Sequence, residues 1–511
     1  MPASARTIVI GAGIGGLAAA LRLRALGRDV LVLERAAEVG GKMRTLPSRA
    51  GPVDTGPTVL TMKPVFDKLF SDIDADLAET VTLIPEPLLA RHWWRDGATL
   101  DLWQDRTRSA QEVGGAFGAR ARQEFEAFAV EAERLFKAFD APMMRAAKPS
   151  QLALTSRVLR EPSLIRAMAP LSSLAQKMAT TFSDPHLRQL YGRYATYVGG
   201  SPFKSPAVLA LISHSEATGV WRVKGGMHQL ARSLRKLAEA RGVVFQTNAE
   251  VTRLEVQNGR VQAVHTGDGR HACSEAVFNG DPRAIALGKL GRRVAGAVEA
   301  KPLEKRSLSA FVWAFASRAR GPDLVHHNVF FARDPAQEFG PIAGGRMTDD
   351  PTLYVCAEDR GTGLTPPEIE RFEIIMNAAP LSQNMGRAPT AEEKDACRQR
   401  THQTLAQFGL TFDDWPPDRA LTTPTEWEAL FPGSAGSLYG QSPHGMMAAF
   451  ARPTARTKIP GLYLVGGGAH PGAGVPMATL SAQHVAAAIA EDQTLTSTSP
   501  QTAMRGGMST A

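Results

Sequence analysis

The chain has only three cysteines in 511 residues, Cys273, Cys356 and Cys397, and no two of them are close in sequence. This scarcity excludes a disulfide framework and a cysteine-rich metal site, and it is typical of a reducing compartment. No apolar run reaches the 18 or more residues that a membrane-spanning helix needs. Arginine-rich tracts and zinc-finger spacings are also missing. We therefore expect no metal site, no spanning helix and no nucleic-acid partner.

The overall composition is that of a large globular protein, with 43% hydrophobic and 21% charged residues. A chain of this length predicts two or three domains. The formal net charge is +8, which fits either an ordinary basic protein or one attracted to an anionic membrane surface. The first apolar stretch contains repeated glycines, which favours a strand, loop and helix over a signal peptide.

A glycine-rich motif follows the first predicted strand, residues 7–10. Gly11, Gly13 and Gly16 form a GxGxxG pattern, a helix follows, and a second apolar strand ends at Glu34. The helix N-terminus attracts a pyrophosphate, and the acid can accept hydrogen bonds from a ribose. This combination predicts a dinucleotide site, which either NAD or FAD could occupy.

Two further segments favour FAD. Gly40 and Gly41, followed by Lys42 and Arg44, extend the first motif beyond what an NAD domain needs. About 450 residues later the strand LYLV leads into the loop GGGAHPGAGVPM and then a helix. Glycines in such a loop let the backbone lie against a flat ring, and the helix N-terminus stabilises negative charge on that ring. The two motifs together predict an FAD site.

Several segments resemble the FAD-dependent carotenoid desaturases of the flavin amine oxidase and phytoene desaturase superfamily. They are ERAAEVGGKMRT, DTGPTVLTM at 54–62, VFNGDPRA at 277–284, YGQSPHGMMAAFARPTART at 439–457 and HPGAGVP. The resemblance covers about residues 6–490. The ending GVPMATLS is most similar to the 1-hydroxycarotenoid 3,4-desaturases of purple phototrophic bacteria, also called methoxyneurosporene or hydroxyneurosporene dehydrogenases.

The resemblance implies an α/β fold, with a Rossmann-like FAD-binding domain assembled from discontinuous segments and an inserted α+β substrate domain. We expect the FAD-binding domain in 1–70, 224–290 and 455–492. The remaining divisions are a helical substrate and membrane-associating domain, a mixed α+β substrate domain and a disordered tail, expected at 71–223, 291–454 and 493–511.

The predicted cofactor-binding residues come from both glycine motifs and from the segments that flank them. They are Gly11, Ala12, Gly13, Gly15, Gly16, Glu34, Arg35, Gly41, Lys42, Arg44, Pro57, Thr58, Val59, Val251, Gly467, Gly468, Gly474, Val475, Pro476 and Met477. Desaturation also requires removal of a proton beside the flavin. Candidate catalytic residues are His470 in the second glycine loop and the pair His214 and Glu216, with Tyr194 and Tyr197 placed near the mouth of the site.

The expected activity is insertion of a C-3,4 double bond into a 1-hydroxy- or 1-methoxy-acyclic carotenoid, with oxygen or a quinone as electron acceptor. The alternatives are a phytoene-type multistep desaturase, a carotenoid isomerase, a flavin amine oxidase, and a non-catalytic FAD-fold binding protein. Residues 141–180 hold six Lys or Arg and one acid among Leu, Met and Ile. This composition fits a helix lying on a membrane surface, so we expect a cytoplasmic, peripherally membrane-associated enzyme. The oligomeric state is left open.

Overall fold

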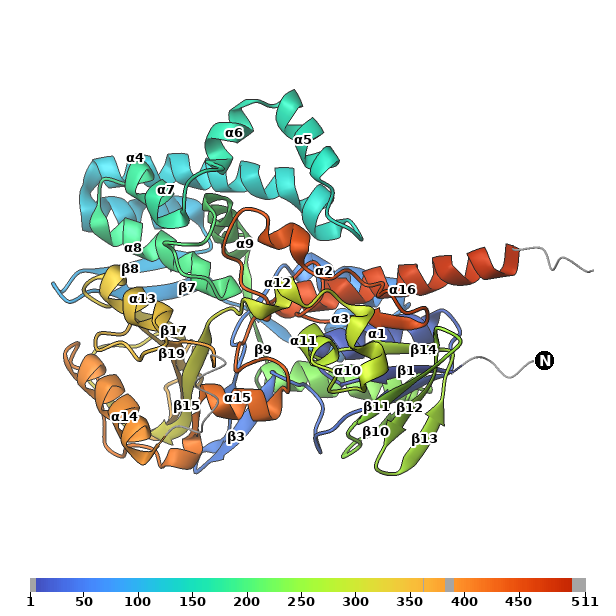
Figure 1. Ribbon diagram of the computed structural model, residues 1–511. Helices are drawn as coiled ribbons and strands as arrows, with labels where there is room; N and C mark the ends of the chain where they lie inside the picture. The colour runs from blue at the N-terminus through green and yellow to red at the C-terminus, as the bar shows by residue number, and fades with distance from the viewer. Residues whose placement is uncertain (1–5, 362, 382–389, 499–511) are drawn as a thin grey trace, which may run out of the picture.

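The computed structural model describes residues 6–361, 363–381 and 390–498, which form two sheet-centred units beneath a layer of helices (Figure 1). The first unit contains a parallel five-stranded sheet of order β10-β2-β1-β14-β22. Its strands are β1 (Thr7–Ile10), β2 (Val30–Leu33), β10 (Val244–Gln246), β14 (Glu275–Phe278) and β22 (Leu462–Leu464). The sheet therefore gathers three pieces of chain, as the sequence predicts for the FAD-binding domain.

Helices cover one face of this sheet. They are α1 (Ile14–Ala25), α10 (Met227–Ala240) and α16 (Val475–Thr498), with α2 (Lys63–Asp72) packed beside α16. Helix α1 is buried on all sides over most of its length because it lies between the sheet, α10 and α16. A small antiparallel sheet of β11 (Arg253–Gln257), β12 (Arg260–Thr266) and β13 (Gly269–Ala272) packs over the other face. The hairpin predicted at Asn258-Gly259 is confirmed, with both residues at positive φ.

The second unit is built on a seven-stranded sheet of order β21-β15-β19-β18-β17-β7-β8. The strands are β7 (Leu88–Trp93), β8 (Thr99–Trp103), β15 (Ser309–Ser317), β17 (His327–Phe330), β18 (Leu353–Ala357), β19 (Glu370–Ala378) and β21 (Leu421–Thr422). Helix α14 (Ala391–Ala406) packs against one face through an apolar cluster that includes Trp313, Phe372 and Leu405. The opposite face is turned toward the helical layer and the first unit.

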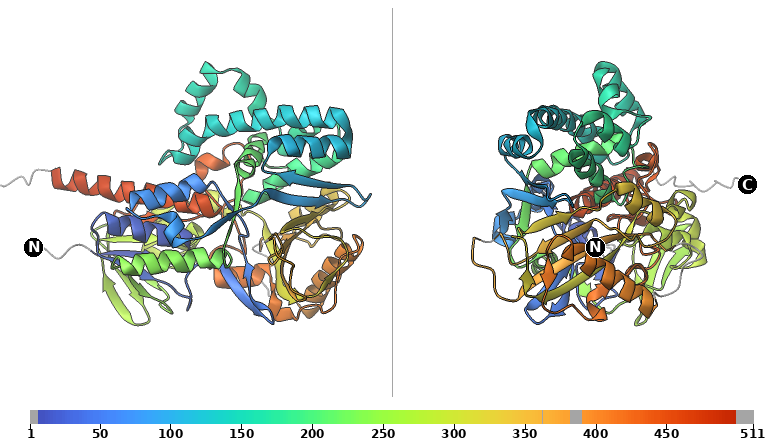
Figure 2. Two further views of the ribbon diagram at one scale, coloured as in Figure 1. Left: turned by 180° about the vertical axis from the view of Figure 1, so that it is seen from behind. Right: turned by 90° about the vertical axis from the view of Figure 1, so that its left-hand side faces the viewer.

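The helical layer lies above both units in Figure 2. It contains α4 (Arg106–Phe139), α5 (Gln151–Arg160), α6 (Ser163–Met168), α7 (Leu174–Thr181), α8 (Pro185–Arg193) and α9 (Ile212–Ala217). Gly118 (φ 91°, ψ 170°) interrupts α4, because this extended positive-φ conformation is one that glycine adopts without steric cost. Among the described residues, no helix has the length and apolarity needed to cross a membrane.

Short elements connect these units. They include the ribbon β3 (Arg44–Ser48) and β4 (Gly51–Thr55), and the small sheet of β5 (Leu60–Thr61), β9 (Val220–Val223) and β6 (Leu83–Pro85). The helices α13 (Pro335–Ala343) and α15 (Pro424–Leu430) lie beside the large sheet.

Two details differ from the sequence predictions. The stretch from about 70 to 220 was expected to be mainly helical, yet residues 83–103 form β6, β7 and β8, and the last two join the large sheet. Helix α16 continues to Thr498, so the predicted tail does not begin at 493, and 499–511 lie outside the described residues. Whether the domain boundaries fall where we placed them remains a prediction.

Candidate active site

The two glycine motifs, far apart in sequence, are in contact. A Cβ placed on Gly15 would lie 2.6 Å from Gly466 Cα, and one on Gly16 would lie 2.1 Å from Gly11 O. Asn279, which follows β14, fixes the junction by donating from Nδ2 to Gly11 O at 3.1 Å. Glycine is therefore required here because backbone meets backbone without room for a side chain. Gly16 thus packs against the first glycine loop, and Gly15 packs against the second.

Glu34 is buried at the end of β2, beside the first motif. Its Oε2 accepts a hydrogen bond from Ala12 N at 2.6 Å, and its Oε1 accepts one from Ala36 N at 2.8 Å. Ala249 N donates to Glu34 O at 2.8 Å, which brings the segment leading to Val251 alongside. Each carboxylate oxygen can accept a further hydrogen bond, so Glu34 retains the capacity for the ribose contact predicted from sequence.

Positive charge collects between the two motifs. Lys42 and Arg452 are both half-buried, and both interact electrostatically with Arg306 and with one carboxylate, Asp281. Burial lowers the pKa of Lys42 to about 8 and that of Arg452 to about 10. Arg452 donates to Gly467 O at 2.6 Å, so this charge lies at the second glycine loop. Cations withdrawn from water require anionic partners, and an anionic dinucleotide such as FAD has the charge that this set needs.

The other predicted cofactor residues fall into two groups. One group lies within or against the start of α1 and consists of the first-motif glycines, Ala12 and Gly41. The second group forms the second glycine loop and the first turn of α16: Gly467, Gly468, Gly474, Val475, Pro476 and Met477. Arg35 is more exposed and donates to Ala429 O at 3.1 Å. Arg44 stacks on Trp427 at 5.6 Å and donates to Thr422 Oγ1. Their contacts with a cofactor stay predictions.

Residues 56–58 lie over the face of the large sheet opposite α14. Gly56 N donates to Glu373 Oε1 at 2.6 Å, and Thr58 Oγ1 lies 2.7 Å from the Tyr354 hydroxyl. The same hydroxyl lies 2.7 Å from His327 Nδ1. The strand register pairs Glu373 with Cys356 and Cys356 with His327, so these side chains share one face. We call His327, Tyr354, Cys356 and Glu373 the polar face; it adjoins the predicted flavin segment Pro57–Val59.

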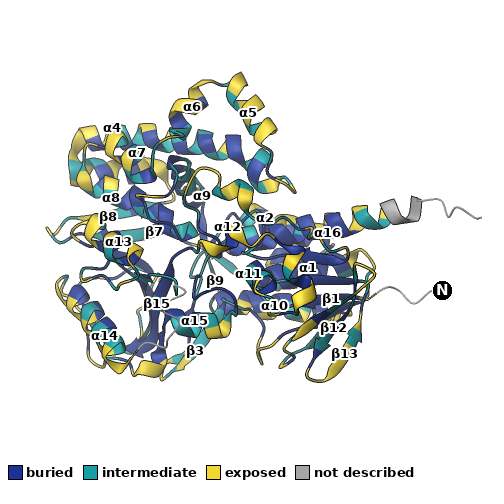
Figure 3. Cartoon of the chain, viewed as in Figure 1, coloured by how far each residue is buried: buried dark blue, intermediate teal, exposed yellow. Residues whose placement is uncertain are grey.

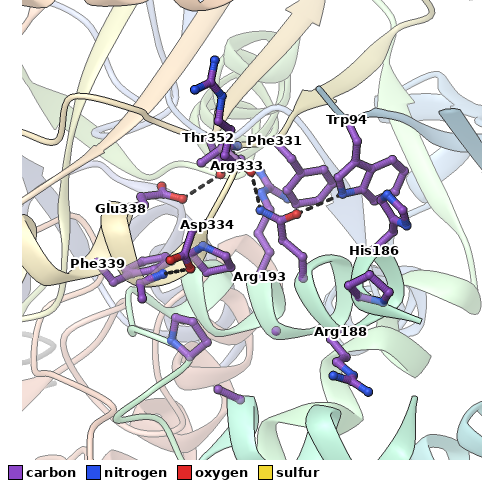
Figure 4. Close-up of a pocket in the computed structure, with 18 of the residues that line it drawn as sticks. Trp94, His186, Arg188, Arg193, Phe331, Arg333, Asp334, Glu338, Phe339 and Thr352 are labelled. Carbon is purple, nitrogen blue, oxygen red and sulfur yellow. Dashed lines mark hydrogen bonds between the residues drawn. The ribbon is translucent and has the colours of Figure 1, made fainter. Parts of the chain in front are cut away.

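A cavity of about 490 Å³ opens over the same sheet face, nearer the other end of the strands (Figure 4). Alternate residues along β19 run from Glu373 through Ile375 to Asn377, and Asn377 lines the cavity. Its wall combines aromatic residues, among them Trp94, Phe331 and Phe339, with charged residues that include four arginines. Because a strand advances about 3.3 Å per residue, the cavity end lies about 13 Å from Glu373 along β19.

Glu338 of α13 faces this cavity as a buried carboxyl group. It accepts hydrogen bonds from Thr352 Oγ1 at 2.6 Å and Asn377 Nδ2 at 2.9 Å. Burial raises the pKa of Glu338 to about 7. Arg193 also lines the cavity, and its guanidinium group lies 5.9 Å from the Tyr354 ring. The arginine therefore links the cavity to the polar face.

Glu216 is the best-placed of the predicted catalytic residues. It is buried, and it accepts hydrogen bonds from the hydroxyls of Tyr194 and Tyr197, the latter at 2.8 Å. Arg193 lies 5.7 Å from the Tyr197 ring as well as near Tyr354. Arg193 therefore lies between the Glu216–Tyr197 pair and Tyr354 of the polar face. Burial raises the pKa of the Glu216 carboxyl.

The two histidine candidates have other surroundings. His470 Nε2 lies 2.8 Å from Ala146 O, and its ring stacks on His484 at 5.5 Å, so it ties the second glycine loop to the helical layer. Burial lowers the pKa of His470 to about 4. His214 points from α9 toward α4, with its ring 5.2 Å from Phe136. The structure thus separates His214 from Glu216, although only one residue lies between them in sequence.

Sequence reasoning missed the polar face and two of the cations near Asp281, which are Arg306 and Arg452. Arg452 lies inside a segment whose resemblance was noted, but nothing in its spacing marks it as half-buried. Glu373 is one acid in a predicted strand, and its alternation with Ile375 and Asn377 is the one signal that could have placed it on a shared face. Only the pairing of β17, β18 and β19 brings Glu373 beside Cys356 and His327.

The chain is similar to known flavoenzymes over almost its whole length. Residues 14–490 match the family of flavin containing amine oxidoreductases. A hydroxyneurosporene desaturase of Cereibacter sphaeroides is 52% identical over 95% of this chain and 98% of its own, and one of Rhodobacter capsulatus is 47% identical over the same shares. An oxidoreductase structure from Methanosarcina mazei shares the fold, with a TM-score of 0.59, 18% identity and coverage of 94% of this chain and 99% of that one.

Proposed function

The chain belongs to the flavin-containing amine oxidoreductase family, and we propose that it is a carotenoid desaturase that introduces a C-3,4 double bond into a 1-hydroxy- or 1-methoxy-acyclic carotenoid. The observation that carries this proposal is the 52% identity to a hydroxyneurosporene desaturase over 98% of that protein. Such similarity extends across the glycine motifs, the helical layer and the large sheet alike. A shared reaction requires all three, because the substrate must be bound as well as the flavin.

The cofactor is FAD, and the residues present fit it. Glu34 has free acceptor capacity for a ribose, and Gly15 and Gly16 let the start of α1 pack closely against both glycine loops. Lys42 and Arg452 supply half-buried positive charge. When bound, FAD supplies the acceptor for the hydride that leaves the carotenoid. The protein itself must hold the polyene, exclude water and take up a proton.

We place the path of an extended substrate along the large sheet. The cavity over Asn377 and Phe331 and the polar face over Glu373 occupy successive parts of one sheet face. The aromatic part of the cavity lining suits a polyene, since apolar and aromatic walls bind hydrocarbon by excluding water. We infer that the chain of the carotenoid enters through this cavity and that its reacting end reaches residues 56–58.

Glu216 is the proton acceptor that we favour. A buried carboxylate becomes neutral on protonation, and burial favours the neutral form. In the same surroundings a histidine would become a buried cation, and burial already lowers the pKa of His470 to about 4. The proton would pass from the substrate carbon to the Tyr197 oxygen as the Tyr197 hydroxyl proton moves to Glu216.

Desaturation is tested with purified holoenzyme and a 1-hydroxylated acyclic carotenoid. We expect the absorption maximum of the product to move to longer wavelength, because one double bond is added to the conjugated system. Anaerobic addition of the same substrate should bleach the flavin. A product spectrum identical to that of the precursor, with the flavin bound and still oxidised, would refute the proposed function.

The localisation proposal concerns α5 and α6, which project from the helical layer (Figure 3). Leu152 and Leu159 are 84% and 74% exposed on the same face of α5, and Leu171, just beyond α6, is 96% exposed. Basic residues, including Arg157 and Arg160, flank them. Exposed apolar side chains bordered by arginine fit a helix lying in the headgroup region of an anionic bilayer. We propose that this surface docks the enzyme on the membrane.

Flotation with vesicles containing anionic lipid tests the docking surface. Each arginine near such a surface contributes about 1 kcal/mol, so reversing Arg157 and Arg160 to glutamate should lower partitioning at least ~30-fold. Reversal of Arg292 and Arg293, which are exposed on the first unit, is the matched control and should leave flotation unchanged. Equal loss in both double variants would show general charge attraction and exclude a docking face.

A further inference from the structure

Glu373, the acid of the polar face, has one unused carboxyl oxygen. Its side chain is fully buried, and Oε1 accepts the hydrogen bond from Gly56 N. Among the residues that the structure describes, Oε2 has no hydrogen-bond partner. Burial also raises the pKa of Glu373 well above its usual value. Burial thus favours the neutral form of this acid, in which the free oxygen can donate a proton to an acceptor.

The position of Glu373 limits what that acceptor can be. The acid contacts residue 56, directly before the predicted flavin segment Pro57–Val59, and it lies on the sheet face that leads to the cavity. In a substrate oxidised at C3–C4, the oxygen on C1 is only two carbons from the reacting bond. A residue that binds this oxygen must therefore adjoin the flavin. Glu373 lies beside the predicted flavin segment, whereas Glu338 is bonded to Asn377, about 13 Å further along β19.

We propose that Glu373 recognises the oxygen on C1 of the carotenoid and so determines the preference for oxygenated substrates. This inference rests on the proposed function. A hydroxyl or methoxy oxygen accepts the hydrogen bond from the free carboxyl oxygen. A hydrocarbon end at the same place leaves that carboxyl buried without a partner, and enzymes reject substrates most strongly when they leave a buried polar group unpaired.

The test compares Glu373→Gln with Glu373→Leu. The amide keeps a donor at the same place, whereas leucine removes both donor and acceptor. We measure kcat/KM and Kd for a 1-hydroxylated acyclic carotenoid and for the same polyene without the oxygen, with Kd read from quenching of tryptophan fluorescence. Flavin content is recorded for each variant. Glu338→Leu, which removes a buried acid at the far end of the face, is the matched control.

We expect Glu373→Leu to reduce the preference for the oxygenated substrate about 10- to 100-fold, while Glu373→Gln retains it to within about threefold. The control Glu338→Leu should affect both substrates equally. An unchanged preference in Glu373→Leu, or a loss that tracks lost flavin, overturns the proposal. If the wild-type protein desaturates neither substrate, the proposed function fails, and the Kd values alone decide on Glu373: equal affinity of the wild type for both polyenes overturns it.

Discussion

Because the two glycine motifs are in contact, we expect Gly→Ala to lower the free energy of unfolding at residue 15 and to raise it at residue 115. Gly15 and Gly115 are both helical, the first in α1 and the second in α4. A Cβ on Gly15 would meet Gly466 Cα at 2.6 Å and Asn279 Oδ1 at 2.8 Å, whereas a Cβ on Gly115 would meet nothing within 4 Å. Ordinary contacts to a Cβ begin at 3.4 Å, so the facing backbone would have to withdraw by about 0.8 Å.

The magnitudes follow from this geometry. In an exposed helix interior, alanine is more stable than glycine by about 1 kcal/mol. Gly115→Ala should therefore raise the free energy of unfolding by 0.5–1 kcal/mol, as an order of magnitude. Overpacking costs about 1–3 kcal/mol, and at Gly15 it acts against backbone atoms, which cannot rotate away. Gly15→Ala should lower the free energy of unfolding by up to about 2 kcal/mol after the helix gain of about 1 kcal/mol is subtracted.

Gly15→Ala should also weaken cofactor binding, because it separates the two loops that we assign to FAD. The assay is denaturant unfolding of both variants, together with the flavin-to-protein absorbance ratio after gel filtration. Gly115→Ala should keep a full complement of flavin. A Gly15→Ala protein as stable and as fully flavinylated as Gly115→Ala would refute the close contact between residues 15 and 466.

Three further outcomes follow from the buried charges. Lys42→Met should weaken FAD binding about 10- to 100-fold, measured by flavin fluorescence titration, and should stabilise the apoprotein, because burial already lowers the pKa of Lys42 to about 8. Glu338→Gln should remove a pH dependence. Burial raises the pKa of Glu338 to about 7, so its stabilising contribution is complete below pH 4.5 and disappears as pH rises through 7. Relative to Glu338→Gln, the wild type should thus lose up to ~3 kcal/mol between pH 4.5 and 8 in denaturant titrations; parallel curves would refute this. Glu216→Gln should lower kcat at least ~100-fold with little change in KM, whereas His470→Gln should not.

Much of the first unit could be predicted because its signals are local. The GxGxxG pattern, the acid at the end of the second strand and the Asn258-Gly259 turn each depend on residues a few positions apart. The strand β22 and its glycine loop are equally local. Their place in one domain with the first motif followed from the resemblance and from the need of one cofactor for both motifs. The contact of Gly15 with Gly466 was not predicted, since no periodicity relates residues so far apart.

Residues 83–103 show where local reasoning fails. Strand β7 pairs in parallel with β17, more than 230 residues later, and β8 forms the edge of the sheet. The segment lies between predicted helical stretches, and a short run such as LLARHW carries too few turns to distinguish strand from helix by periodicity. Its strand conformation is stabilised by pairing with β17, which tertiary structure supplies and sequence does not reveal.

The polar face could not be predicted either, because it too depends on how distant segments pack. Period-two alternation tells which residues of β19 share a side, but it cannot tell whether that side faces α14 or the flavin segment. Phe372 and Ile374 face the apolar core against α14, which leaves Glu373 on the other side. An acid there is buried because Gly56 covers it, and Gly56 N binds one of its two oxygens. Glu373 is thus left with one unused oxygen because a strand packs against a predicted cofactor segment more than 300 residues away in sequence. Single substitutions at this position should therefore change substrate preference in this family while the glycine motifs stay the same.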